Sequence, residues 1–298
     1  MRILLCCTAA LFAACASSNG NSRAPSDAIV RARDLPERHR AVLEAWQKGE
    51  RAWEVERDAV RADPELARFV VDNLLIEMVQ AFDRSRISKP GEKAGPFERA
   101  QRELVLLAEH STPLLAQSLA LKDGVIGFLA ADTLTKIGAR AVPDVAALLA
   151  DKHTEARRRA AELLGRLPSA PEGEPSVLEA LAARLEKDEA WIVRAQAALA
   201  LGARGARQDH KGFALARLST ALADEDATVA ESAAKALGEL GEVRAVPRLI
   251  DGLSAAVTAG RPGVVDALNK SLMRLSGSAT KKDVAQWRAW WKAHDARQ

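Results

Sequence analysis

The chain has 298 residues and a net charge of +3, from 43 basic and 40 acidic side chains. This nearly balanced charge differs from the one-sided positive field of nucleic-acid-binding proteins, so we expect no nucleic-acid partner. Aromatic residues make up 4% of the chain and hydrophobic residues 48%, most of them alanine, leucine and valine, which favours an all-α fold of closely packed helices.

The first residues have the order of a signal peptide. Arg2 precedes an apolar run over 3–14, and small and polar residues follow. The five residues that end at Cys15 read Leu-Phe-Ala-Ala-Cys, which resembles the lipobox of bacterial lipoproteins. The resemblance implies that residues 1–16 are a lipoprotein signal peptide and that Cys15 is lipidated to anchor the protein in a membrane. All three cysteines lie in this segment, so the folded body has no disulfide and no thiolate metal site.

The lipobox resemblance also implies a location. Ala16 follows the cysteine, where an aspartate would retain the protein at the inner membrane, so we expect an outer-membrane lipoprotein that faces the periplasm. The alternative is ordinary cleavage at the Ala-Cys-Ala sequence over 14–16, which would release a soluble periplasmic or secreted protein. Residues 17–34 are polar and contain Pro25, which indicates a flexible tether.

A helical module is predicted over 35–90, ahead of the rest of the fold. Apolar residues step mostly by seven between Val42 and Val60, which predicts one long helix over 36–62 that Gly49 weakens. A second helix is predicted to follow it.

The second helix begins at the Asp-Pro-Glu sequence over 63–65, which combines an N-cap, a first-turn proline and an acid at the positive helix end. Proline, glycine and lysine fill the segment 84–96, which predicts a loop and a domain boundary. A repeat array is predicted beyond it, over 97–277.

Five copies of one helical pattern occur in register within the array. The central position of each copy is a leucine, and apolar residues stand four and eight positions before it. A proline, or in one copy Phe213, starts the other helix, and these starting residues are spaced by 30, 32, 38 and 34 residues. Such spacings suit two short helices and two turns. The central leucines are Leu134, Leu164, Leu201, Leu237 and Leu272.

The copies share the order Asp, Arg, Ala-Ala, Leu-Gly and Val-Pro, which resembles the HEAT-like repeats, including the variety named for phycobilisome lyases. The fourth copy keeps Asp224 but has Ala230 in place of the arginine. The complete pairs are Asp151 with Arg157 and Asp188 with Arg194. The resemblance implies an α-solenoid of about five to six helical hairpins. Because Asp and Arg recur at successive corners, we expect them to cap helices and pair between repeats.

The C-terminal segment 278–298 is predicted to be a helix that caps the array. Trp287, Trp290 and Trp291 lie at positions i, i+3 and i+4, on one helix face. An end repeat otherwise exposes its apolar stripe to water, so we expect the three rings to cover that stripe. An aromatic ligand site is the alternative.

The sequence holds no motif for catalysis or for a cofactor. Its five histidines are scattered without the spacing of metal ligands, and neither a nucleophilic-serine motif nor a phosphate loop is present. The Gly-Ala-Arg-Gly sequence at 202–205 indicates a helix end. We therefore expect no enzyme, no cofactor and no metal.

These features predict a non-enzymatic protein-binding scaffold at the cell envelope. One alternative is a factor that resembles phycobilin lyases and handles a chromophore or an acceptor protein, and another is a purely structural envelope lipoprotein. In HEAT-like arrays the second helix of each repeat lines the concave side, and its basic side chains suggest an acidic protein segment as the partner. The predicted binding residues are Arg158, Arg159, Arg166, Lys235, Lys270 and Arg274.

Overall fold

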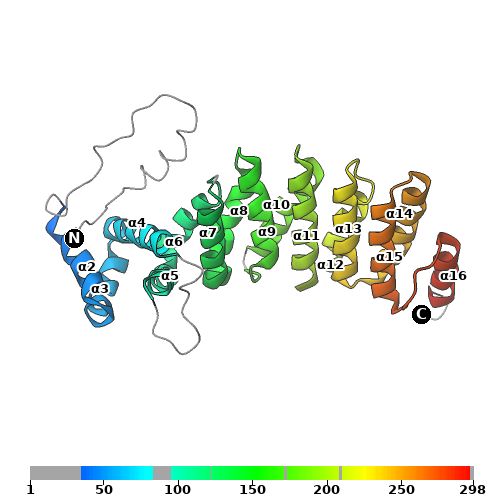
Figure 1. The fold of residues 1–298 in the computed structure, drawn as a ribbon. Coiled ribbons are helices and arrows are strands. Elements are labelled where there is room, and N and C mark those ends of the chain that lie inside the picture. Colours follow the sequence, from blue (N-terminus) through cyan, green and yellow to red (C-terminus); the bar gives the residue numbers. More distant parts are fainter. Residues whose placement is uncertain (1–34, 83–94, 122, 171–172, 208–209, 296–298) are drawn as a thin grey trace, which may run out of the picture. The chain divides into compact units, whose positions relative to one another are not determined.

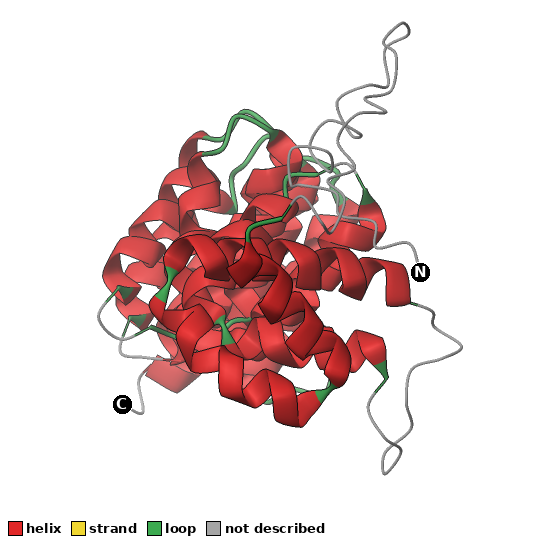
Figure 2. Ribbon diagram, turned by 90° about the vertical axis from the view of Figure 1, so that its left-hand side faces the viewer, coloured by secondary structure: helices red, strands yellow, loops and turns green. Residues whose placement is uncertain are grey.

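The computed structural model describes residues 35–82, 95–121, 123–170, 173–207 and 210–295. The predicted signal peptide with Cys15, the tether, and most of the predicted loop over 84–96 lie outside the described residues. Within these ranges the chain forms helices and loops and no strand, as the coloured ribbon of Figure 2 shows. The contacts divide the chain into two compact units, Met1–Ala141 and Val142–Gln298. Each unit is therefore described by itself.

The first unit is a set of packed helices (Figure 1). Its buried side chains form a hydrophobic cluster. Trp53, Leu66, Met78 and Leu104 are among its largest fully buried side chains. The elements are α2 (Glu37–Lys48), α3 (Glu50–Ala62), α4 (Pro64–Ala81), α5 (Pro96–Leu106), α6 (Ala108–Ser118), α7 (Gly124–Ile137) and the 3-10 helix η3 (Gly138–Ala141).

The single long helix predicted over 36–62 is wrong, because the chain breaks at Gly49. Gly49 has φ 111° and ψ −176°, a conformation that glycine adopts without steric cost. The break lets α2 and α3 pack against each other, with the Trp46 and Trp53 rings edge to face at 5.3 Å between centroids. The spacing of seven therefore places apolar side chains on the facing sides of two short helices.

The predicted start of the second helix is confirmed. Asp63 is the N-cap of α4, and its Oδ1 accepts hydrogen bonds from the backbone amides of Glu65 and Leu66, both at 3.1 Å. Pro64 occupies the first turn, where its missing amide hydrogen costs nothing.

The second unit is built from helical hairpins whose helices form two layers. One layer, here called the stacked layer, consists of α9, α11, α13 and α15, each packed on the next (Figure 1). The helices α8, α10, α12 and α14 pack beside it. The elements are α8 (Val142–Ala147), η4 (Leu148–Ala150), α9 (Thr154–Arg166), α10 (Glu174–Lys187), α11 (Trp191–Arg207), α12 (Lys211–Ala221), α13 (Ala227–Leu240), η5 (Val243–Ala245), α14 (Val246–Thr258), α15 (Pro262–Ser276) and α16 (Val284–Asp295).

The register of the repeats agrees with the burial of their side chains. All five central leucines are fully buried, and so are the residues four positions before them. The residues eight positions before are buried as well, except Ile126, which is half-buried. The apolar stripe that defines the pattern is thus the core of each hairpin.

Glycines after the central leucines set the spacing of the stacked layer. A Cβ added to Gly202 would lie 2.7 Å from the Cβ of Ala236, and one added to Gly238 would lie 2.7 Å from the Oγ of Ser271. At Gly165 the corresponding distance to the Cα of Ala200 is 3.2 Å. The Leu-Gly sequence therefore recurs because each helix approaches the next one closely at this point.

The helix end predicted at 202–205 is wrong, because these residues lie inside α11. Gly205 is buried against α12, where an added Cβ would lie 2.5 Å from the Cβ of Ala214. Glycine serves close packing here and does not end the helix.

Candidate functional site

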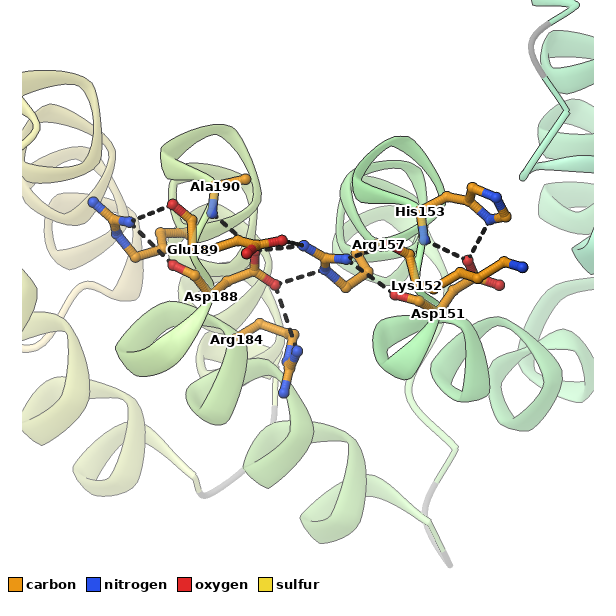
Figure 3. A network of polar contacts seen from close by, with 9 residues as sticks. Asp151, Lys152, His153, Arg157, Arg184, Asp188, Glu189 and Ala190 are labelled. Carbon is orange, nitrogen blue, oxygen red and sulfur yellow. Dashed lines mark hydrogen bonds and ion pairs between the residues drawn. The ribbon is translucent and has the colours of Figure 1, made fainter.

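A ladder of ion pairs runs along one end of the stacked layer. The guanidinium of Arg157 donates from Nε and Nη2 to the carboxylate of Asp188, at 2.7 and 2.9 Å (Figure 3). Its Nη1 donates to the backbone carbonyls of Asp151 and Lys152 at 3.0 and 3.2 Å. Arg157 thus closes the turn of its own repeat and joins that turn to the next repeat.

The next step of the ladder repeats this geometry. Arg194 donates to the two carboxylate oxygens of Asp224 at 3.0 and 2.9 Å, and its Nη1 donates to the carbonyl of Asp188 at 3.0 Å. The inter-repeat pairing predicted for these residues is therefore confirmed. The ladder is a structural feature, because its guanidinium groups are already held by carboxylates and carbonyls.

The third step uses an arginine from elsewhere in the chain. Ala230 leaves the turn after Asp224 without its own guanidinium, and Arg261, at the start of α15, takes that place. Arg261 donates to the carbonyls of Asp224 and Glu225 at 2.9 and 3.3 Å. The same backbone groups are satisfied, but the donor belongs to the following repeat.

The buried carboxylate of Asp188 is stabilised in its charged form. Its side chain is 1% exposed, and this burial acts to raise its pKa. Hydrogen bonds from the Arg157 side chain and the Ala190 amide outweigh burial, so the pKa of Asp188 lies below its usual value of 3.8. Asp188 therefore remains an anion near neutral pH.

The predicted arginine cluster on α9 is largely neutralised by acids of the same helix. Arg158 donates to both carboxylate oxygens of Glu155 at 2.8 Å and to Glu162 at 2.9 Å, while Arg159 donates to Glu155 at 2.7 Å. Hydrogen bonds from Arg158 also hold the pKa of Glu155 below its usual value. Arg166 is exposed at the end of the helix. Three arginines and two glutamates leave this surface a net charge of +1.

Lys235 and Lys270, two of the predicted binding residues, line one groove between α11, α13 and α15. This α11–α15 groove has a volume of about 430 Å³. Leu199 and Ala267 provide its apolar part, and Lys270 pairs with Asp266 at 2.6 Å. Arg274 is exposed toward the end of α15, outside the residues that line the groove.

Several apolar side chains of α11 are not fully buried. Trp191 is 45% exposed, and Ile192, Leu199 and Ala203 are half-buried. Ile192, Leu199 and Ala203 lie on one side of α11 by helical spacing, and the buried Ala195 separates Trp191 from Leu199. Sequence analysis missed this face, although a helix with apolar residues on both sides is a visible signal.

The three tryptophans of α16 differ in burial. Trp287 is fully buried, and its Nε1 donates to Oδ1 of Asn269 on α15 at 2.9 Å. Trp290 and Trp291 are half-buried, and the Trp290 ring stacks on His294 at 5.0 Å between centroids. Only Trp287 is fully inserted against the preceding repeat, while the other two rings lie at its margin.

The described residues carry neither a cluster of metal ligands nor a membrane-spanning helix. No group of histidine, cysteine, aspartate and glutamate side chains in these ranges could hold a metal ion. None of the helices that the structure describes combines the length and apolar composition needed to cross a membrane.

Comparison with known families agrees with the hairpin geometry. Residues 112–202 match the family of HEAT repeats, and residues 229–255 match the PBS lyase HEAT-like repeat. The chain carries HEAT repeats. Both matches lie inside the predicted array, so the repeat resemblance and the all-α HEAT-like solenoid are confirmed. None of the curated proteins is similar to this chain in sequence.

Several solved structures resemble this chain in fold at low sequence identity. The crystal structure of YibA from Escherichia coli has 17% identity and a TM-score of 0.50, covering 67% of this chain and 69% of its own. A mutant of Kap121p has 14% identity and a TM-score of 0.44, and the match spans 78% of this chain but 27% of Kap121p. An engineered protein has 16% identity and a TM-score of 0.39, covering 79% and 67% of the two chains. Such likeness concerns the fold alone.

Proposed function

We propose that this HEAT-repeat scaffold is not an enzyme and that it binds a protein segment in the α11–α15 groove. The observation that supports binding is the apolar part of the groove at Leu199 and Ala267, with Trp191 exposed on the same helix as Leu199. Protein interfaces combine an apolar centre of this kind with a polar rim. Apolar patches that are exposed on the surface of a folded protein often mark sites of interaction with other proteins.

Lys235 supplies a cation that can pair with an acidic partner, although the groove carries Glu231 and Asp266 beside Lys235 and Lys270. Lys235 is exposed and forms no ion pair with the residues that the structure describes, whereas Arg158 and Arg159 are already paired. A segment with one apolar anchor and a neighbouring carboxylate would place the anchor at Leu199 and the carboxylate at Lys235. This changes the expected centre of binding from α9 to the groove, while the acidic chemistry of the partner stays the same.

The test compares variants of the two surfaces in crosslinking and pull-down from envelope fractions. We expect Leu199→Glu and Lys235→Glu to keep wild-type helicity and to lose a partner that the wild type retains. Capture by the wild type should weaken as salt rises. If the triple change of Arg158, Arg159 and Arg166 to Glu abolishes capture and the groove variants do not, the partner binds α9 instead.

We also propose that the scaffold is anchored at the outer membrane and faces the periplasm, through a lipid on Cys15. The Leu-Phe-Ala-Ala-Cys sequence supports this proposal. Labelled palmitate should enter the wild type, and Cys15→Ser should abolish labelling and release the protein from the membrane fraction. Several acyl chains anchor a protein stably, whereas one binds marginally. A soluble, unlabelled wild type would contradict the anchor and leave the groove proposal standing.

A further inference from the structure

The first unit contains a cleft of about 290 Å³ with charged, amide and aliphatic side chains. We call it the indole cleft, because Trp46 lies at its centre. Its walls come from α2, α3, α4 and α5, which all belong to the first unit. The volume is near the lower limit of small-molecule sites, so it suits a ligand the size of one or two amino acids.

Opposite charges contact the same indole ring in this cleft. The Nε1 of Trp46 donates to Oε2 of Glu77 at 2.6 Å. The guanidinium carbon of Arg99 lies 4.4 Å from the centroid of the Trp46 ring, and the Trp53 ring packs edge to face against it at 5.3 Å. The carboxylate and the guanidinium are thus held around one rigid side chain.

Neither charge is neutralised by a side chain that the structure describes. Within the described part of the chain, Glu77 and Arg99 form an ion pair neither with each other nor with another side chain. Two buried donors also lack a hydrogen-bond acceptor, namely Nε of Arg99 and Nε1 of Trp53. Trp53 is 1% exposed, and a buried donor without an acceptor destabilises a fold unless a ligand satisfies it.

The other lining residues are suited to a small amphipathic ligand. Gln47 and Gln80 contribute side-chain amides, and Leu43 and Ile76 form an aliphatic wall. Asn73 donates its amide to the carbonyl of Phe69 at 2.7 Å, so its Oδ1 remains an acceptor. The cleft therefore offers donors, acceptors and apolar surface together.

We propose that the indole cleft binds a small zwitterion of the α-amino acid type, as a free amino acid or a short peptide. Its carboxylate would accept hydrogen bonds from the guanidinium of Arg99, and its ammonium group would donate to Glu77. An anion alone would leave Glu77 uncompensated, and a cation alone would leave Arg99 uncompensated. A ligand that carries both charges satisfies both groups, and an aliphatic side chain fills the remaining wall.

The experiment is calorimetric titration of the full-length protein with a panel of free L-amino acids and their dipeptides. We expect saturable binding of at least one member with an aliphatic side chain. The N-acetylated form and the amide of that ligand, which each lack one charge, should bind at least about tenfold more weakly. The class that binds more tightly, free amino acids or dipeptides, is the ligand that the cleft prefers.

Two variants test which residue binds each charged group of the ligand. Arg99→Gln should weaken the zwitterion at least about tenfold while sparing the amide form, and Glu77→Gln should do the same while sparing the N-acetylated form. Glutamine at 77 can still accept the hydrogen bond from Trp46, so the fold should be retained. The matched controls are Arg140→Gln and Glu54→Gln, which are exposed and outside the cleft, and they should bind as the wild type does.

The proposal is overturned if no member of the panel binds at up to about 10 mM, which corresponds to a negligible affinity. It is also overturned if removal of either ligand charge, or either cleft variant, leaves affinity unchanged. Helicity and thermal unfolding of each variant, measured alongside, separate loss of the ligand from loss of the fold.

Discussion

At the scale of single residues, the ladder shows how hydrogen bonds stabilise a buried carboxylate. Asp188 receives two hydrogen bonds from Arg157 and one from the Ala190 amide, at 3.1 Å. Glu189, its neighbour, also approaches Arg157, at 3.4 Å, but is 84% exposed. One guanidinium thus has a buried and an exposed carboxylate partner, which allows a matched comparison.

We expect Asp188→Asn to destabilise the fold by about 3 kcal/mol, because it removes one member of a buried ion pair and leaves Arg157 with only the exposed Glu189 as a carboxylate partner. Glu189→Gln is the control and should stay within about 0.5 kcal/mol, since exposed pairs contribute little. Urea unfolding at neutral pH measures both values. Equal effects of the two changes would contradict the structural role assigned to Asp188.

The same carboxylate predicts a dependence on pH. Because its pKa is lower in the folded than in the unfolded chain, Asp188 stabilises the fold fully above about pH 4. This contribution is lost as pH falls through the folded-state pKa. The difference in unfolding free energy between wild type and Asp188→Asn should therefore shrink on acidification below about pH 4.

At the scale of helices, the stacked layer depends on the absence of side chains at three places. Gly165, Gly202 and Gly238 each follow a central leucine and face the next helix. Glycine weakens a helix interior by about 1 kcal/mol relative to alanine, so these residues are retained for the approach they permit. The closest approaches are at Gly202 and Gly238.

Gly202→Ala should therefore destabilise the fold by about 1–3 kcal/mol, because its Cβ would overlap Ala236 across the helix interface. Gly212→Ala in α12 is the control, since no atom lies within 4 Å of its added Cβ. That change should be neutral or slightly stabilising. Thermal unfolding distinguishes the two, and a stabilising Gly202→Ala would mean that the helices are free to separate.

The sequence predicted the helices better than the contacts between them. The five leucines specify the register because helical periodicity is local, and the cap at Asp63 is local too. The pairing of Arg158 with Glu155 and Glu162 also follows from spacings of three and four on one helix, so it could have been predicted.

Contacts between distant segments had no comparable signal. Trp46 meets Glu77 and Arg99, which lie 31 and 53 positions later in the chain. No periodic pattern connects such positions, so the indole cleft depends on tertiary packing. The close approach at Gly202 was misread for the same reason, because its cause is a residue of the next repeat.

At the scale of the whole chain, the stability of each repeat in an array depends on its interfaces with the neighbouring repeats. The last hairpin, α14 and α15, has one neighbour within the array and is covered on its other side by α16. Trp287 is the fully buried part of that cover, and its indole also satisfies Asn269, which is 6% exposed.

Trp287→Ala should remove about 3–5 kcal/mol of local stability, as truncation of a buried tryptophan does. Amide exchange should rise in α14 and α15 and change little in α9, because each repeat contacts only its neighbours. Trp290→Ala, on a half-buried ring, is the control and should have a smaller effect. Uniform destabilisation of the second unit would instead indicate that it unfolds as one cooperative block.

Because of Arg261, one turn of the array depends on a side chain of the following repeat. The turns closed by Arg157 and Arg194 carry their own donor, so their carbonyls are satisfied within one hairpin, although both guanidinium groups also pair with a carboxylate of the following repeat. The hairpin of α12 and α13 differs, because the carbonyls of Asp224 and Glu225 are satisfied by the residue that opens α15. Swapping or duplicating repeats at this point would separate a turn from its donor. The unit of rearrangement here is therefore a pair of hairpins, from Lys211 to Ser276, and not the single hairpin that the sequence pattern marks.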